Sequence, residues 1–148
     1  MLKIKKAVFF IKNELFRKYS IKEYKDALIR ESFSKKEIEE LNWKKRKRLI
    51  RFVYENNNFY RDFYKDSNFH PKQLRFERDW IKVPILEKDH IRACSDQILD
   101  SKLPKDNLIS VTTGGTTGEP IKLFRDKRFP EEIIKWRMLK RWNLHPGV

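Results

Sequence analysis

The 148-residue chain has a single cysteine, Cys94. One cysteine excludes an internal disulfide and a metal cage built from cysteines, and it fits a reducing cytoplasm. Because no histidine is placed to activate this thiol, we expect Cys94 to be a buried structural residue within a helix. The three histidines, His70, His90 and His145, lack the i, i+4 spacing and the acidic neighbours that are typical of zinc sites. The sequence therefore indicates no metal ligand among them.

The chain also lacks a long hydrophobic run near its start. Residues 7–11 are apolar, but five residues are too few for a secretory signal or for a membrane span of about 20 residues. Apolar residues recur there at helical spacing instead: Ile4, Ala7, Val8, Ile11 and Leu15. This leader stripe predicts a helix that packs on the rest of the domain, and the alternative is an interfacial membrane helix within residues 1–20.

Acidic residues are scarce, with 21 Asp and Glu against 35 Lys and Arg and a formal net charge of +14. Residues 1–51 hold 17 basic against 7 acidic residues, so most of the excess lies in this part. Such a segment can bind nucleic acid, an acidic partner or an anionic membrane surface, but a solvated face is the interpretation we favour. The five cations at 44–48 would surround a helix axis, and no specific nucleic-acid-binding motif accompanies them.

Three of the four glycines fall within residues 112–120, together with four threonines. Glycines let backbone N–H groups approach an anion, and threonine hydroxyls add uncharged donors, so this composition predicts a phosphate-binding loop. The β-forming residues at 108–111 and 121–124 predict a strand on each side. The loop lacks the Gly-Lys-Ser/Thr ending of a Walker A motif and the glycine spacing of a dinucleotide fingerprint. A glycine-bearing turn without a ligand is the alternative.

The loop resembles the signature of adenylate-forming enzymes, commonly written Thr/Ser-Ser-Gly-Thr-Thr-Gly-Lys-Pro. The matching residues are Thr113, Gly115, Thr116, Thr117, Gly118 and Pro120, whereas Gly114 replaces the serine and Glu119 replaces the lysine. The upstream segments 60–64 and 83–92 and the downstream segments 124–128 and 145–147 are similar to the phenylacetate-CoA ligase and capsular polysaccharide biosynthesis (CapK-like) branch. The resemblance covers about residues 50–148.

This resemblance implies a ligase that uses ATP and Mg²⁺ to convert a carboxylic acid to an acyl adenylate and then transfers the acyl group to CoA or another acceptor. It implies phosphate ligands from Thr113, Gly115, Thr116, Thr117 and Gly118, and no catalytic base in this chain. Since Glu119 is negative, charge neutralisation would come from Mg²⁺ or from Lys122 and Arg125. The later motifs of these enzymes are absent, so we expect the N-terminal part of a larger protein that is not catalytically complete alone. The alternative is a non-catalytic basic module that binds nucleic acid or an anionic membrane surface, or a truncated remnant.

The predicted architecture is a mixed α/β chain that is helical to about residue 98, followed by a β-hairpin around the loop and a further helix. We expect a basic helical leader over 1–33 and an incomplete adenylate-forming N-terminal domain over 34–148. Ser34 and Glu37 form a capping box that predicts a helix start, and the asparagines at 56–58 predict its end. The predicted buried residues of the helices are these: Ile38, Leu41, Leu49, Phe52, Val53, Tyr60, Phe63, Tyr64, Trp136, Leu139 and Trp142.

Overall fold

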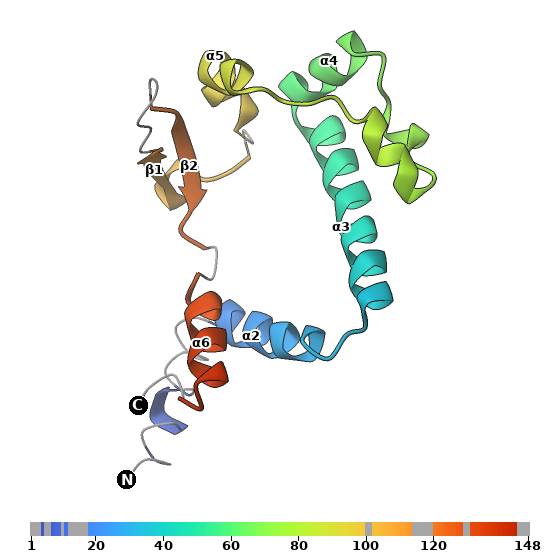
Figure 1. The fold of residues 1–148 in the computed structure, drawn as a ribbon. Helices are drawn as coiled ribbons and strands as arrows, with labels where there is room; N and C mark the ends of the chain where they lie inside the picture. The colour runs from blue at the N-terminus through green and yellow to red at the C-terminus, as the bar shows by residue number, and fades with distance from the viewer. Residues whose placement is uncertain are drawn as a thin grey trace. The chain divides into compact units, whose positions relative to one another are not determined.

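The computed structural model describes residues 4, 7–9, 11, 18–99, 102–113, 120–128 and 131–144. These residues form a mixed, mostly helical fold with one two-stranded antiparallel sheet (Figure 1). Two compact units divide the chain: Met1–Ile38 with Arg128–Val148, and Glu39–Lys127. The predicted boundary between a leader and a partial domain, after residue 33, is not tested by this division into compact units and stays a prediction.

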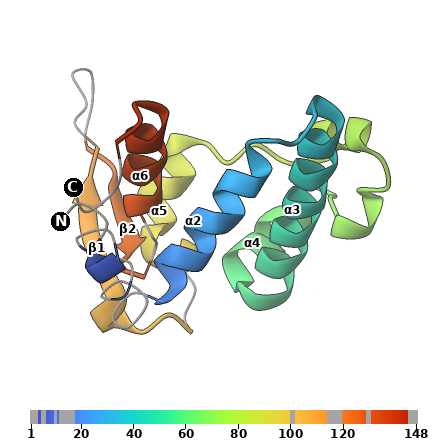
Figure 2. The ribbon, with the colours of Figure 1, turned by 90° about the horizontal axis from the view of Figure 1, so that it is seen from below.

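The first unit packs helix α2 (Lys18–Arg30) against helix α6 (Glu132–Arg141), which lie side by side in Figures 1 and 2. Its core consists of Ile21, Tyr24 and Trp136, and the Tyr24 and Trp136 rings meet edge to face with centroids 5.5 Å apart. Burial raises the pKa of the Tyr24 hydroxyl, and the charge of Glu31 adds to this effect. Tertiary aromatic packing therefore joins segments more than 100 residues apart.

An ion pair reinforces the same contact between α2 and α6. Arg137 Nε donates to Glu31 Oε1 at 2.8 Å, just beyond the end of α2. The hydrogen bond from Arg137 lowers the pKa of the Glu31 carboxyl below its ordinary value. The chain leaves α6 through Asn143, whose φ of 56° is the left-handed conformation that asparagine tolerates at a helix C-terminus.

Trp142 was predicted to be buried, and this prediction is wrong. Trp136 is 6% exposed, whereas Trp142 is 65% exposed and lies just after the end of α6. The Trp142 N–H still donates to the Met138 carbonyl oxygen at 3.3 Å, so helical spacing continues to this residue. At about 100° per residue, Trp142 lies about 120° around the axis from Trp136, which places the two side chains on different sides of α6.

Helix α3 (Lys35–Asn56) begins at the predicted capping box. Glu37 Oε2 accepts hydrogen bonds from the N–H and the hydroxyl of Ser34, both at 2.7 Å, and Ser34 Oγ accepts from the Glu37 N–H at 3.3 Å. These bonds lower the pKa of the Glu37 carboxyl. The capping box of Ser34 and Glu37 therefore predicted the start of this helix correctly.

The buried face of α3 differs from the predicted one. Ile50 is 6% exposed, whereas Leu49 and Phe52, both predicted to be buried, are 58% and 47% exposed. The residues that do pack in the second unit's core are Trp43, Ile50, Val53 and Tyr54. At about 100° per residue, this face is rotated by roughly one residue position from the predicted one. Of the predicted residues Val53 does pack in this core, whereas the prediction left out the rings of Trp43 and Tyr54.

The second unit's core gathers around helix α4 (Asn58–Asp66) and the 3₁₀-helices η1 (Pro71–Gln73) and η2 (Glu77–Lys82). Its buried residues are Ile50, Tyr64, Phe69 and Leu74, with Tyr60 and Phe63 packed against them, so the core role predicted for the aromatic segment is confirmed. Burial raises the pKa of the Tyr64 hydroxyl to about 12, with a smaller contribution from Tyr60.

Helix α5 (Lys88–Ile98) follows an extended segment at Val83, as predicted from Pro84. Cys94 lies in this helix and is half-buried, but its φ of −123° and ψ of 24° are not helical. The 3₁₀-helix η3 (Lys105–Asn107) then leads into strands β1 (Leu108–Thr112) and β2 (Lys122–Asp126). The strands pair antiparallel, with Thr112 opposite Lys122, which confirms the predicted strand pair.

The leader stripe does not pack as predicted. Ile4, Ala7, Val8 and Ile11 are helical but exposed, whereas Phe9, off the stripe, contacts the Trp136 ring with centroids 5.5 Å apart. Leu15 lies outside the described residues. Among the residues that the structure describes, no helix combines the length and the apolar character needed to cross a bilayer.

Candidate functional site

The predicted phosphate loop lies between β1 and β2, and Thr113 and Ile121 close its base. The Thr113 N–H donates to the Ile121 carbonyl oxygen at 3.1 Å, and the Ile121 N–H donates to Thr113 Oγ1 at 3.0 Å. A hydroxyl has one proton to donate as well as lone pairs to accept, so the Thr113 hydroxyl can still donate to a ligand. Thr113 is exposed, which leaves that proton accessible.

Of the five predicted phosphate ligands, the structure describes only Thr113. Gly115, Thr116, Thr117 and Gly118 lie outside the described residues, as do Gly114 and Glu119. The structure therefore describes only the base of the site. This base consists of Thr112 at the end of β1, the following residue Thr113, and the segment from Pro120 into β2.

The two cations suggested as replacements for the missing lysine are placed differently. Lys122 pairs with Thr112, one residue beyond the Thr113–Ile121 closure, and its Nζ lies 5.1 Å from the centroid of the Phe124 ring. Arg125 is opposite Ile109, three residues further along β2. Side chains three residues apart on a strand point to opposite faces. Lys122 and Arg125 therefore cannot act together on one face, and Lys122 is the one next to the loop.

The opposite end of the hairpin is also held in place. The Lys127 N–H donates to the Asn107 carbonyl oxygen at 2.7 Å, and Lys127 Nζ donates to the Asp106 carbonyl oxygen at 2.9 Å. Hydrogen bonds at both ends fix the register of β1 and β2, and with it the two residues from which the loop starts and ends.

A small, mostly apolar cavity of about 270 Å³ adjoins β2 on the side of α5. Its lining is as follows: Ile91, Ser95, Ile98, Leu99, Leu103, Lys122, Leu123 and Phe124. Among the described residues of this lining, Lys122 is the only charged one, and it belongs to the base of the loop as well. The cavity and the candidate phosphate site thus share one side chain.

The described histidines serve local structure. His70 Nδ1 accepts the Lys72 N–H at 3.1 Å, and His90 Nδ1 accepts the Glu87 N–H at 3.2 Å at the start of α5. His145 lies outside the described residues. Within the described ranges, no group of three or more His, Cys, Asp or Glu side chains is placed to hold a metal ion.

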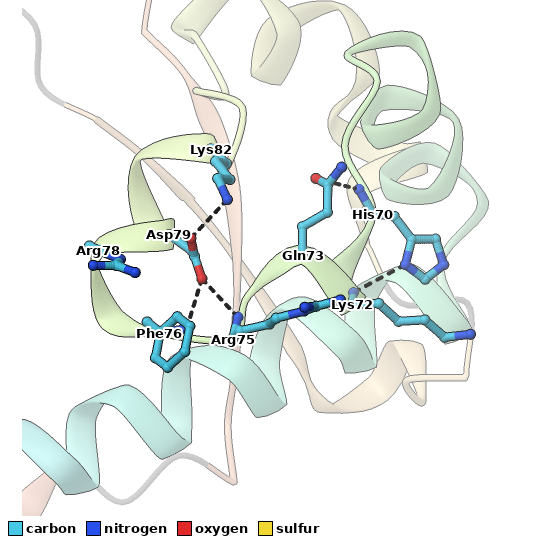
Figure 3. A pocket seen from close by; sticks show the side chains of 8 residues that line it. All are labelled: His70, Lys72, Gln73, Arg75, Phe76, Arg78, Asp79 and Lys82. Carbon is cyan, nitrogen blue, oxygen red and sulfur yellow. Dashed lines mark hydrogen bonds and ion pairs between the residues drawn. The ribbon is translucent and has the colours of Figure 1, made fainter.

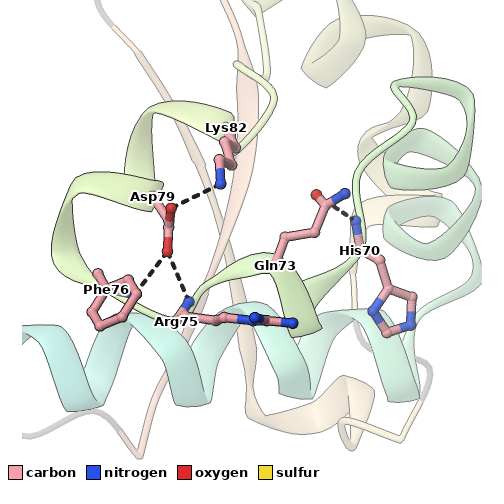
Figure 4. A network of polar contacts seen from close by, with 6 residues as sticks. All are labelled: His70, Gln73, Arg75, Phe76, Asp79 and Lys82. Carbon is pink, nitrogen blue, oxygen red and sulfur yellow. Dashed lines mark hydrogen bonds and ion pairs between the residues drawn. The ribbon is translucent and has the colours of Figure 1, made fainter.

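A second polar cluster, around Asp79, was not indicated by any sequence motif (Figure 4). Asp79 Oδ2 accepts the N–H groups of Arg75 at 3.0 Å and Phe76 at 2.7 Å, and Oδ1 accepts from Lys82 Nζ at 2.8 Å. The hydrogen bond from Lys82, followed by that from Phe76, lowers the pKa of the Asp79 carboxyl to about 2. The only sequence signal for this cluster is a carboxylate three to four residues from its donors. This spacing is too common in sequences to indicate a cluster.

Comparison with known proteins does not extend these observations. No protein-family model matches the chain, and a search of curated proteins gave no significant match. The functional argument therefore depends on the residues of the hairpin and on their resemblance to the adenylate-forming signature.

Proposed function

We propose that this chain is the N-terminal part of an ATP-dependent adenylate-forming ligase, with a role in capsule or surface polysaccharide synthesis. Such an enzyme joins a carboxylic acid to AMP, releases pyrophosphate and passes the acyl group to CoA or another acceptor. The observation that carries the proposal is the antiparallel β1–β2 pair with the signature sequence at its turn. A cytoplasmic location is part of the proposal, because the substrates named are those of the cytoplasm.

In this proposal the loop binds phosphate and does not itself make bonds. A carboxylate is a poor electrophile, and attack on the α-phosphorus of ATP gives it a good leaving group. The Thr113 hydroxyl, the N–H groups of Gly115 and Gly118, and the hydroxyls of Thr116 and Thr117 would donate to the oxygens of the departing pyrophosphate. Lys122 would add one positive charge at the base of the loop.

Mg²⁺ normally accompanies the phosphates of ATP and reduces their negative charge. Next to the loop, Thr112, Thr113 and Lys122 offer hydroxyl, amide N–H and ammonium groups that can donate to phosphate oxygens, and the described residues place no group of three or more His, Cys, Asp or Glu side chains for a metal ion. We therefore assign this chain's residues to the phosphate and none of them to the metal. The acidic metal-binding segment, the ribose-binding aspartate and the catalytic lysine of such enzymes would come from the rest of the protein.

The small size of the sheet supports an origin in a larger domain. In the described residues β1 pairs with β2 and with no further strand. Two strands are marginally stable alone, and in this chain α5 packs against β2. A larger sheet in the complete domain would add neighbouring strands.

MgATP binding to the full 148-residue chain, followed through backbone amide signals by NMR, tests the role of the loop. We expect shifts at residues 113–121 that disappear in Thr116→Ala with Thr117→Ala and persist in the matched control Thr112→Ala, one residue before the loop. In the complete gene product the same double variant should lower acid-dependent pyrophosphate release. Wild-type shifts that avoid residues 113–121 would contradict the proposal.

One observation favours a second candidate function, peripheral contact of residues 1–20 with an anionic membrane. The described residues of the leader stripe are exposed: Ile4 by 67%, Val8 by 57% and Ile11 by 59%. Lysines at 3, 5, 6 and 12 accompany them in the sequence. Exposed aliphatic side chains with nearby cations are typical of interfacial helices.

A further inference from the structure

The segment from His70 to Lys82 forms an open depression of about 670 Å³ in the second unit (Figure 3). Its lining residues are His70, Lys72, Gln73, Arg75, Phe76, Arg78, Asp79 and Lys82. The volume lies within the range of about 300–1,000 Å³ that is usual for small-molecule sites. The lining contains four permanent cations and one carboxylate, so its charge is strongly positive.

The carboxylate does not neutralise the two arginines. Both oxygens of Asp79 are already engaged, by two backbone N–H groups and by Lys82 Nζ. The other acid of this segment, Glu77, faces α3, where Arg46 Nη1 approaches its Oε1 at 3.9 Å. Arg46 also lies over the Trp80 ring at 5.3 Å. The acids of residues 70–82 therefore have partners other than the side chains of Arg75 and Arg78.

Several donors of the depression remain available. The side chains of Lys72 and Arg75 make no hydrogen bond or ion pair with the residues that the structure describes, and Arg78 lies over the Phe76 ring at 5.1 Å. Gln73 Oε1 accepts the His70 N–H at 3.3 Å, which leaves the Gln73 amide group as a donor. Figure 3 shows the Arg75 side chain extending below Gln73 in the direction of Lys72.

Asp79 fixes the backbone from which these donors project. By accepting the N–H groups of Arg75 and Phe76 it holds the connection between η1 and η2, and by accepting from Lys82 it holds the end of η2. Cations carried by a hydrogen-bonded turn lose less conformational entropy on binding than cations on a free chain. The cluster in Figure 4 thus acts as a frame for the depression.

We propose that this depression is a binding site for a compact soluble anion that carries two or more phosphate groups. Guanidinium groups bind phosphate through paired hydrogen bonds, and lysines add point charges. One phosphate group could occupy only a small part of 670 Å³, whereas a diphosphate or triphosphate presents more charge and more oxygens to the four cations of the lining. This site is separate from the hairpin and does not depend on the function proposed for it.

Pyrophosphate is the probe for the test, with the full chain and amide signals followed by NMR at low ionic strength. We expect shifts at residues 70–82 and a dissociation constant that rises about tenfold or more in Arg75→Gln with Arg78→Gln. The matched control is Arg48→Gln with Arg51→Gln, two exposed arginines of α3 that remove the same charge. It should change the dissociation constant by less than about twofold, since neither residue lines the depression.

Further variants separate this site from the alternatives. Thr116→Ala with Thr117→Ala should leave the shifts at 70–82 unchanged. If the glutamine double variant does not fold by circular dichroism, Lys72→Gln provides the same readout without altering a described contact. Equal weakening of pyrophosphate binding in both arginine double variants would mean diffuse charge attraction and would overturn the proposal. Shifts confined to residues 113–121 would also overturn it, as would binding to phosphatidylglycerol vesicles without binding to pyrophosphate.

Discussion

The side-chain amide of Asn57 donates to the carbonyl oxygen of Gln97 at 3.0 Å, across 40 residues of chain. The same nitrogen lies 3.1 Å from the carbonyl oxygen of Ile98, and Asn57 Oδ1 accepts the Tyr60 N–H at 3.2 Å. One buried residue therefore caps the start of α4 and also satisfies carbonyls at the end of α5.

Replacement of Asn57 should separate these two roles. Asn57→Ala loses both the cap and the long-range donor, and we expect it to lower the free energy of unfolding by about 2–3 kcal/mol. Asn57→Asp retains the acceptor for Tyr60 but places a carboxylate against the Gln97 and Ile98 carbonyls, so it should rescue little. Urea unfolding followed by circular dichroism measures both. Asn58→Ala, at an exposed neighbour, should cost less than about 0.5 kcal/mol; equal losses at 57 and 58 would refute the special role of Asn57.

The sequence predicted local features of this fold better than the contacts between distant segments. The break at the asparagines, the capping box of Ser34 and the paired strands around the loop are all local, and all are present. The bond from Asn57 to Gln97 and the pair of Arg137 with Glu31 depend on how distant segments pack, which no spacing reports. For the candidate site, the sequence predicted the strand pair and the loop between its strands, but not the closure of the loop by Thr113.

Two neighbouring residues of α3 test which face of that helix is buried. Ile50→Ala should lower the free energy of unfolding by about 2–4 kcal/mol, because Ile50 packs with Tyr64, Phe69 and Leu74 in the core. Leu49→Ala removes an exposed side chain and should cost less than about 1 kcal/mol. Thermal and urea unfolding of both variants measure these losses. A larger loss of unfolding free energy in Leu49→Ala than in Ile50→Ala would support the buried face that the sequence predicted.

Asp79 predicts an acid-dependent loss of stability. Its pKa of about 2 in the folded chain lies below the value of about 3.9 for an unfolded aspartate. A lowered folded pKa stabilises the fold above the unfolded pKa, and this contribution disappears as the pH falls from about 4 to about 2. The difference in unfolding free energy between wild type and Asp79→Asn should therefore shrink over that interval. Lys82→Gln removes the largest cause of the shift and should narrow the interval; a difference that does not vary with pH would contradict this role.

Thr113 makes a specific prediction for the base of the loop. Thr113→Val keeps the side-chain shape but removes the oxygen that accepts the Ile121 N–H, and we expect a loss of about 1 kcal/mol with faster hydrogen exchange at the Ile121 amide. Thr112→Val is the matched control, since no described hydrogen bond uses its hydroxyl. If the Ile121 amide exchanges at the same rate in both variants, the side-chain bond does not hold the loop closed.

The exposed leader stripe predicts binding to anionic membranes through two contributions, insertion of its apolar side chains and charge attraction by its lysines. Burial of an exposed isoleucine contributes about 1 kcal/mol or more to membrane binding. Ile4→Ser with Ile11→Ser should therefore lower the partition coefficient onto phosphatidylglycerol vesicles, measured by sedimentation, at least about tenfold. Ile29→Ser with Ile134→Ser removes two isoleucines that are each 60% exposed elsewhere in the first unit, and it should have little effect. Salt should weaken the wild type further, because the leader lysines contribute charge attraction. If both isoleucine pairs behave alike while salt alone abolishes binding, the basic residues of the chain act as a charged surface and the stripe does not enter the membrane.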